Sequence, residues 1–304
     1  MSLILVTGAT GRHGGTGAHV ACRLQQEGHQ VRVLVRMKDE RSEALEAAGF
    51  DVRFGDLRDR ASLLPAMQGI EQATFCFPID AGIVEAAASF ASALKKEAPA
   101  ARVVVMSMVV AQESSPTHLG RAQWLAEEVM ASFGLRLSVL RVAAMFYENV
   151  LFLHRDSIRE RGVLRNCFGE VKTPWIAGDD AGELMLSALL HPERFGQQIV
   201  YTPGAEVLSH DDIARVLSSE LGRPVRYESI SREAWQAELL DLTARDRPVL
   251  NANMARHISA VGAALAHRGG AQKAPVAGDL AQLMGRAPTS FRDFVRARRG
   301  DFAK

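Results

Sequence analysis

The stretch ILVTGATGRHG at residues 4–14 decides the fold class, because it joins an apolar strand to a glycine-rich turn. Gly8, Gly11 and Gly14 are three residues apart, and a helical pattern follows over residues 15–27. Glycines let the chain turn sharply and bring backbone N–H groups against a phosphate at the start of a helix. The spacing differs from the commoner GxGxxG, so a merely flexible turn is the alternative. In this strand–turn–helix setting, the stretch predicts a loop that binds a dinucleotide pyrophosphate.

The second predicted strand, residues 29–36, ends in Arg36. An NAD-binding chain usually offers Asp or Glu at this place to the ribose hydroxyls. A guanidinium instead holds a 2′-phosphate through two charge-assisted hydrogen bonds, and Lys38 would add a second positive charge. The alternative is an ordinary solvated arginine at a strand end. Beside the glycine turn, Arg36 predicts NADP(H) as the cofactor.

The composition places the chain among soluble enzymes. Its 304 residues, 47% of them hydrophobic, suffice for one large or two modest domains. A formal net charge of +1 gives no overall attraction to nucleic acid or membranes. The apolar run at the N-terminus is too short for a signal peptide, and no stretch reaches the ~18 apolar residues of a membrane span. We therefore expect a cytoplasmic protein with no membrane or nucleic-acid partner.

Cysteine and histidine spacing gives no sign of a metal site. Cys22, Cys76 and Cys167 are widely spaced, and none belongs to a CxxC pair. The nine histidines include no HExxH motif. The sequence therefore predicts neither a disulfide framework nor a bound metal.

Strand and helix patterns alternate over the first half of the chain, which predicts a parallel sheet with right-handed crossovers. We expect a doubly wound α/β (Rossmann) domain over residues 1–141 and a smaller substrate lobe over residues 142–304, partly interleaved with it. The segment 142–180 looks irregular and carries aromatic residues between short helical pieces. Further strand candidates are residues 51–54, 72–77, 102–106, 136–140, 198–202 and 225–230.

Further motifs follow in order: VLVR at 33–36, GDLRD at 55–59, FYEN at 146–149, YTPG at 201–204 and GRAP at 285–288. Together with the glycine turn, they resemble the NmrA-like branch of the atypical short-chain dehydrogenases over nearly the whole chain. Within that branch, the chain is similar to NADPH quinone oxidoreductases and triphenylmethane reductases. The resemblance implies an NADP-binding domain, a C-terminal lobe and a substrate cleft between them.

The resemblance also implies which residues contact the cofactor. They are Gly8, Thr10, Gly11, Arg12, His13, Gly14, Arg36, Asp56, Leu57, Phe77, Pro78 and Ser107. The first six would surround the pyrophosphate, the arginine after the second strand would hold the 2′-phosphate, and the Asp–Leu pair would contact the adenine. The last three would lie beside the nicotinamide and its ribose. Core packing of Phe77, a turn at Pro78 and a helix cap at Ser107 are the alternatives.

The substrate would lie outside the carboxyl ends of the parallel strands, where open α/β sheets bind ligands. We expect Tyr147, Asn149 and Trp175 to line this cleft, because aromatic walls suit a flat, electron-poor substrate. Simple packing of the lobe is the alternative for Tyr147.

The acid–base pair of typical short-chain dehydrogenases is absent, because none of the three tyrosines has a lysine four positions later. Related quinone reductases have a histidine where Gln123 stands, followed by a glutamate that matches Glu127. Glutamine cannot act as a proton donor with a tuned pKa. His118 is the substitute catalytic candidate, with a surface or capping histidine as the alternative.

Three functions stay open. We favour an NADPH-dependent reductase of a quinone, azo or aromatic compound, because hydride transfer to such acceptors needs orientation more than a strong acid. The second is an NADP(H)-binding redox sensor with a protein partner and little turnover. The third is a DNA-associated protein that uses the basic end of the chain, where a solvated helix face is the simpler interpretation. We expect a monomer or homodimer.

Overall fold

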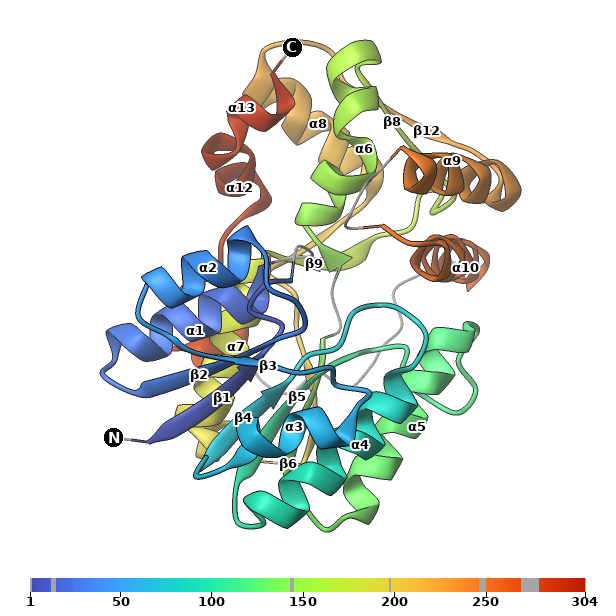
Figure 1. Ribbon diagram of the computed structural model, residues 1–304. Helices are drawn as coiled ribbons and strands as arrows, with labels where there is room; N and C mark the ends of the chain where they lie inside the picture. The colour runs from blue at the N-terminus through green and yellow to red at the C-terminus, as the bar shows by residue number, and fades with distance from the viewer. Residues whose placement is uncertain are drawn as a thin grey trace.

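The computed structural model describes residues 2–11, 15–142, 145–196, 198–245, 250–268 and 279–303. A parallel sheet flanked by helices forms the larger part of the molecule. A smaller lobe lies beyond the carboxyl ends of its strands (Figure 1). Within these residues, no helix is both long and apolar enough to cross a membrane.

In the described part of the chain, the central sheet has seven strands in the order β10-β6-β5-β4-β1-β2-β3, and every pairing is parallel. The strands are β1 (Leu3–Thr7), β2 (Gln30–Val35), β3 (Asp51–Phe54), β4 (Gln72–Phe75), β5 (Arg102–Met108), β6 (Arg136–Val142) and β10 (Ile199–Thr202). The chain runs from β1 to β3 in one direction and then returns to β4 on the other side of β1. The predicted doubly wound fold is confirmed, and its switch of strand order lies between β1 and β4.

Helices cover both faces of the sheet (Figure 1). One face carries α1 (Thr16–Gln26), α2 (Glu40–Ala47) and α7 (Gly178–Leu190), and the other carries α3 (Arg60–Met67), α4 (Ile83–Glu97) and α5 (His118–Ser132). In β1, Ile4 and Val6 pack with the first group, whereas Leu5 packs with the second. A strand buried on both faces has no polar side to show, which explains its unbroken apolar sequence.

The second half of the chain contributes to this sheet as well as to the lobe. Strand β10 extends the sheet beside β6, and helix α7 packs along α1. The short helix α11 (Leu280–Met284) packs against α7, and the 3-10 turn η1 (Pro192–Arg194) follows α7. The chain therefore leaves the central sheet and its covering helices after β6 and returns to them twice.

The described part of the lobe contains two small sheets. Strands β7 (Met145–Phe146), β9 (Thr173–Ile176) and β11 (Glu206–Leu208) form one, and β8 (Val163–Asn166) pairs with β12 (Arg226–Ser229) in the other. Its helices are α6 (Glu148–Arg161), α8 (His210–Leu221), α9 (Arg232–Ala244), α10 (Ala252–Arg268), α12 (Phe291–Ala297) and α13 (Arg299–Phe302). The segment that looked irregular in the sequence thus holds a helix of 14 residues, α6, and the start of α7.

Candidate functional site

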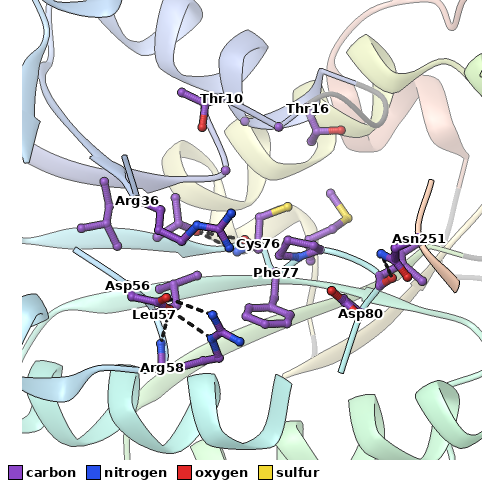
Figure 2. A pocket seen from close by; sticks show the side chains of 18 of the residues that line it. Thr10, Thr16, Arg36, Asp56, Leu57, Arg58, Cys76, Phe77, Asp80 and Asn251 are labelled. Atoms are coloured by element: carbon purple, nitrogen blue, oxygen red, sulfur yellow. Dashed lines mark hydrogen bonds and ion pairs between the residues drawn. The ribbon is translucent and has the colours of Figure 1, made fainter. Parts of the chain in front are cut away.

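A cavity of about 690 Å³ opens at the carboxyl ends of β1, β2, β4 and β5 (Figure 2). Loops that follow these strands form most of its wall, and the lobe contributes Phe146, Asn251 and Met254. The cavity therefore lies between the sheet and the lobe, at the switch of strand order where open α/β sheets bind ligands.

The turn after β1 needs glycine at more than one position. Gly8 has a φ of +78°, which disfavours any other residue. Gly11 donates its N–H to the Gly8 carbonyl oxygen at 2.9 Å, and a Cβ on Gly11 would meet that same oxygen at 2.9 Å. A Cβ on Gly17 would lie only 2.5 Å from the Gly8 carbonyl. The turn is therefore tight, and helix α1 packs directly on it.

Gly17 is the residue that sequence reasoning missed. The sequence interpretation named Gly8, Gly11 and Gly14 instead. Gly14 lies outside the described residues, as do Arg12 and His13. The three-residue glycine spacing continues from 14 to 17, so the signal was present in the sequence. Helix α1 starts at Thr16 without a side-chain cap from the described residues and without an acidic residue in its first turn. Its N-terminus can thus interact with an anion.

Guanidinium groups border one side of the cavity, and in the described part of the chain these are Arg36, Arg41 and Arg58. Arg41 donates to the Thr10 carbonyl at 2.7 Å, which ties α2 to the glycine turn. Arg58 pairs with Asp56 at 3.1 Å (Figure 2). Arg36 is exposed and has no hydrogen bond or ion pair with a described residue. It is therefore the guanidinium that is left for a ligand.

Two carboxylates lie beside these arginines, and each already has partners. Asp39 caps α2 by accepting from the backbone N–H groups of Arg41 and Ser42, both at 3.1 Å, and it pairs with the Arg41 guanidinium at 2.5 Å. The hydrogen bond from Arg41 lowers the pKa of Asp39, and that from Arg58 lowers the pKa of Asp56. Among the described residues, a phosphate at Arg36 would therefore meet carboxylates whose charge is already balanced.

A buried chain of polar side chains ends in the cavity at Ser107. The Ser107 hydroxyl donates to Glu127, which accepts from Arg141 Nε at 3.0 Å and Nη2 at 2.5 Å. Arg141 Nη1 also contacts the Tyr201 hydroxyl at 2.6 Å. Burial raises the pKa of Glu127, and the hydrogen bonds from Arg141 and Ser107 oppose that shift. Ser107 is thus held in place by a network that spans β5, α5, β6 and β10.

The cavity brings together most of the predicted cofactor residues. Those that line it are Gly8, Thr10, Gly11, Arg36, Asp56, Leu57, Phe77, Pro78 and Ser107. Lys38 is exposed and does not line it, whereas Arg41 lines it as part of the ion pair with Asp39. Burial raises the pKa of the cavity residue Cys76 to about 11, so its thiol stays protonated at neutral pH.

The aromatic residues expected at the substrate cleft lie elsewhere. Tyr147 is fully buried, donates its hydroxyl to Glu206 at 2.8 Å and packs against Phe291. Trp175 is also buried, and its indole N–H donates to a backbone carbonyl at 3.0 Å. Both rings build the lobe core, contrary to the expectation. Phe146, the last residue of β7, lines the cavity instead.

The structure also places His118 and Asn149 outside the cavity wall. His118 is exposed at the start of α5, where Thr117 caps the helix by accepting from the Gly120 N–H at 2.9 Å. Asn149 is half-buried in the first turn of α6. His118 was expected as a catalytic candidate and Asn149 as a cleft residue, but neither is among the residues that line the cavity.

Comparison with known proteins identifies the family. The model of the NmrA-like family matches residues 1–263. The chain belongs to the NmrA-like family. It is 31% identical to an NAD(P)H azoreductase from Xenophilus azovorans over 231 residues, which cover 76% of this chain and 78% of that relative.

Solved structures share the fold of this NmrA-like protein over almost the whole chain. An NADPH-dependent quinone oxidoreductase from Escherichia coli, complexed with NADPH, superimposes with a TM-score of 0.78 at 22% identity, covering 97% of this chain and 99% of that one. A triphenylmethane reductase from Citrobacter sp., complexed with NADP(H), gives a TM-score of 0.78 at 21% identity with the same coverage. Both similarities support the Rossmann-type architecture.

Proposed function

We propose that this NmrA-like protein is an NADPH-dependent oxidoreductase that passes a hydride to an electron-poor small molecule such as a quinone or an azo compound. One observation carries the proposal: a single cavity joins a tight glycine turn and an unpartnered guanidinium, Arg36, to the buried polar network that ends at Ser107. The turn and the N-terminus of α1 suit a pyrophosphate, and Arg36 suits a 2′-phosphate.

The names of similar proteins support the same reaction class. The azoreductase, the quinone oxidoreductase and the triphenylmethane reductase are all named for the reduction of conjugated acceptors. The nicotinamide cofactor supplies the hydride when it is bound. The described wall residues include no Tyr–Lys pair, which favours acceptors that can take a hydride without a strong general acid.

The test is NADPH oxidation, followed at 340 nm, against a panel of quinones, azo dyes and aldehydes. We expect consumption of NADPH with quinones or azo dyes above the rate without acceptor, and none with simple aldehydes. Tight binding of NADPH without reduction of any acceptor would contradict the reductase and favour the redox sensor. If calorimetry showed no binding of NADPH or NADH, both functions would be excluded.

A further inference from the structure

Gln123 is a polar side chain without a partner in the wall of the cavity. It lies on α5, is only 4% exposed and lines the cavity. Its amide nitrogen, Nε2, is buried and has no hydrogen-bond acceptor among the described residues. A buried donor left unsatisfied carries the full cost of its lost hydration. The position of this donor therefore indicates a ligand atom that accepts its hydrogen bond.

Helix geometry puts Gln123 beside the network at Ser107. Gln123 and Glu127 are four residues apart on α5, so they lie on the same face of the helix. Glu127 holds the Ser107 hydroxyl at the end of β5 and is itself fixed by Arg141. The amide of Gln123 and the hydroxyl of Ser107 therefore face the same part of the cavity.

Three other polar side chains of the cavity wall, Ser107, Asn251 and Thr7, already donate hydrogen bonds within the protein. The Ser107 proton is donated to Glu127, so Ser107 offers a ligand only its lone pairs. The Asn251 amide donates to the Ile79 carbonyl at 3.2 Å, and the Thr7 hydroxyl donates to the Thr74 carbonyl at 3.1 Å. The Gln123 Nε2 donor has no such commitment and is available to an acceptor molecule bound near Ser107.

We propose that Gln123 Nε2 donates a hydrogen bond to the acceptor atom on which negative charge develops when the hydride arrives. This inference rests on the proposed reductase function and names its substrate class: compounds with a conjugated carbonyl oxygen or azo nitrogen. A neutral amide stabilises such charge without transferring a proton. A cationic triphenylmethane dye develops no such charge and gains nothing from this donor.

The reaction balances without an acid from the protein. A quinone that accepts a hydride gains two electrons and becomes a hydroquinone monoanion, while NADPH is oxidised to NADP⁺. The oxygen that carries the charge accepts from Gln123, and water supplies the one proton that completes the hydroquinone. Gln123 is thus a catalytic residue that touches the substrate but does not titrate.

The experiment compares Gln123→Leu with the wild-type protein and with Gln26→Leu, which removes an exposed glutamine at the end of α1. We expect Gln123→Leu to lower kcat/KM for a quinone on the order of 100-fold, as losing one oxyanion donor does. The affinity for NADPH and the rate with a triphenylmethane dye, where that dye is reduced, stay unchanged. Calorimetry on the NADP⁺-loaded protein should show weaker binding of the hydroquinone to Gln123→Leu. Gln26→Leu should match the wild-type protein in each measurement.

A second variant keeps the test independent of packing at position 123. Gln123→His retains a donor that also titrates, so its kcat/KM for the quinone should rise as the pH falls and the imidazole gains a proton, whereas the wild-type profile stays flat. If Gln123→Leu kept the wild-type kinetics with the quinone and the wild-type affinity for the hydroquinone, this inference would be wrong, while the proposed reductase function would stand. A wild-type protein that reduces no acceptor would instead overturn the proposed function.

Discussion

At the scale of one residue, Arg36 is the basis for the cofactor preference that we expect of the cavity. Its guanidinium has no hydrogen bond or ion pair with a described residue, whereas the neighbouring Asp39 is paired with Arg41. We expect NADPH to bind more tightly than NADH by about 1–3 kcal/mol, the range for charge-assisted hydrogen bonds. Arg36→Ala should remove most of that preference and leave NADH binding nearly unchanged. Dissociation constants measured by calorimetry check this expectation.

Lys38→Ala is the matched control, because Lys38 is basic and exposed but does not line the cavity. It should leave both dissociation constants within about twofold of the wild-type values, less than about 0.5 kcal/mol. Equal affinities for NADH and NADPH in the wild-type protein would refute the role of Arg36.

His118 is the residue for which the structure changes the expected outcome. The sequence offered it as a substitute proton donor, but it is exposed at the start of α5, away from the wall that holds Ser107. We expect His118→Ala to change kcat by less than about twofold, far below the 10²–10⁴-fold typical of losing a general acid. Steady-state kinetics with a quinone measure this. A large fall in kcat at unchanged NADPH affinity would make His118 the acid after all.

At this scale, the cavity residues easiest to predict from the sequence are those at the carboxyl end of a strand. Arg36 and Ser107 each lie at a strand end, and both line the cavity. Arg41 could not be found this way, because it reaches the cavity only after α2 begins and Asp39 folds back as its cap. Gln123 was noticed as a departure from related reductases, but only burial shows that its amide lacks a partner.

At the scale of elements, the contact between the glycine turn and α1 should control cofactor binding. A Cβ on Gly11 would meet the Gly8 carbonyl oxygen at 2.9 Å, and a larger side chain would also occupy the space needed by a pyrophosphate. We expect Gly11→Val to abolish detectable NADPH binding in calorimetry while the protein still folds, as judged by circular dichroism.

Gly222→Ala provides the control for general strain at a glycine. Gly222 ends α8 with a φ of +66°, and no atom lies within 4 Å of a Cβ there. This variant should lose about 1 kcal/mol of stability and bind NADPH normally. Normal NADPH binding by Gly11→Val would reduce the turn to a structural role.

Helices and strands whose apolar residues recur with a clear period were predicted well. Elements without such a repeat were not. The strand candidates of the first 141 residues agree with the structure to within two residues at each end. Helix α7 was missed because it is buried on nearly every side, so its apolar residues form no single stripe. Its buried Asp180 pairs with Arg286 at 2.7 Å, a long-range contact that local patterns cannot show.

At the scale of the whole molecule, the lobe is held together by the aromatic residues that the sequence assigned to the substrate cleft. Tyr147 and Trp175 stack with ring centroids 6.4 Å apart, and both pack into the core formed with α8 and α12. Aromatic content in an irregular segment predicts that a lobe exists. It does not predict which rings face the ligand, because that depends on how the small sheets place each side chain.

The lobe also buries histidines, so the stability of the molecule should fall in acid. Burial lowers the pKa of His154 and of His210 to about 3 and that of His257 to about 4, against 6.5 in the unfolded chain. The unfolded chain therefore binds more protons below pH 6.5, and stability is lost as the pH falls from 6.5 toward 3. Burial raises the pKa of Glu148 to about 7. Because the folded chain then binds this proton more readily than the unfolded chain, Glu148 increases the stability as the pH falls from 7 to 4.5.

His154→Phe isolates one of these contributions, because His154 stacks on Trp235 at 5.0 Å between ring centroids and phenylalanine retains a ring there. The free energy of unfolding from urea titrations should fall less between pH 8 and pH 5 in this variant than in the wild-type protein. A histidine that is neutral when folded and has a pKa of 6.5 when unfolded costs about 2 kcal/mol at pH 5, so the two falls should differ by about that amount. Comparing each protein with itself at pH 8 removes the effect of altered packing. Identical falls in the two proteins would mean that His154 is protonated in the folded state, and the lobe core would then have to admit a charge.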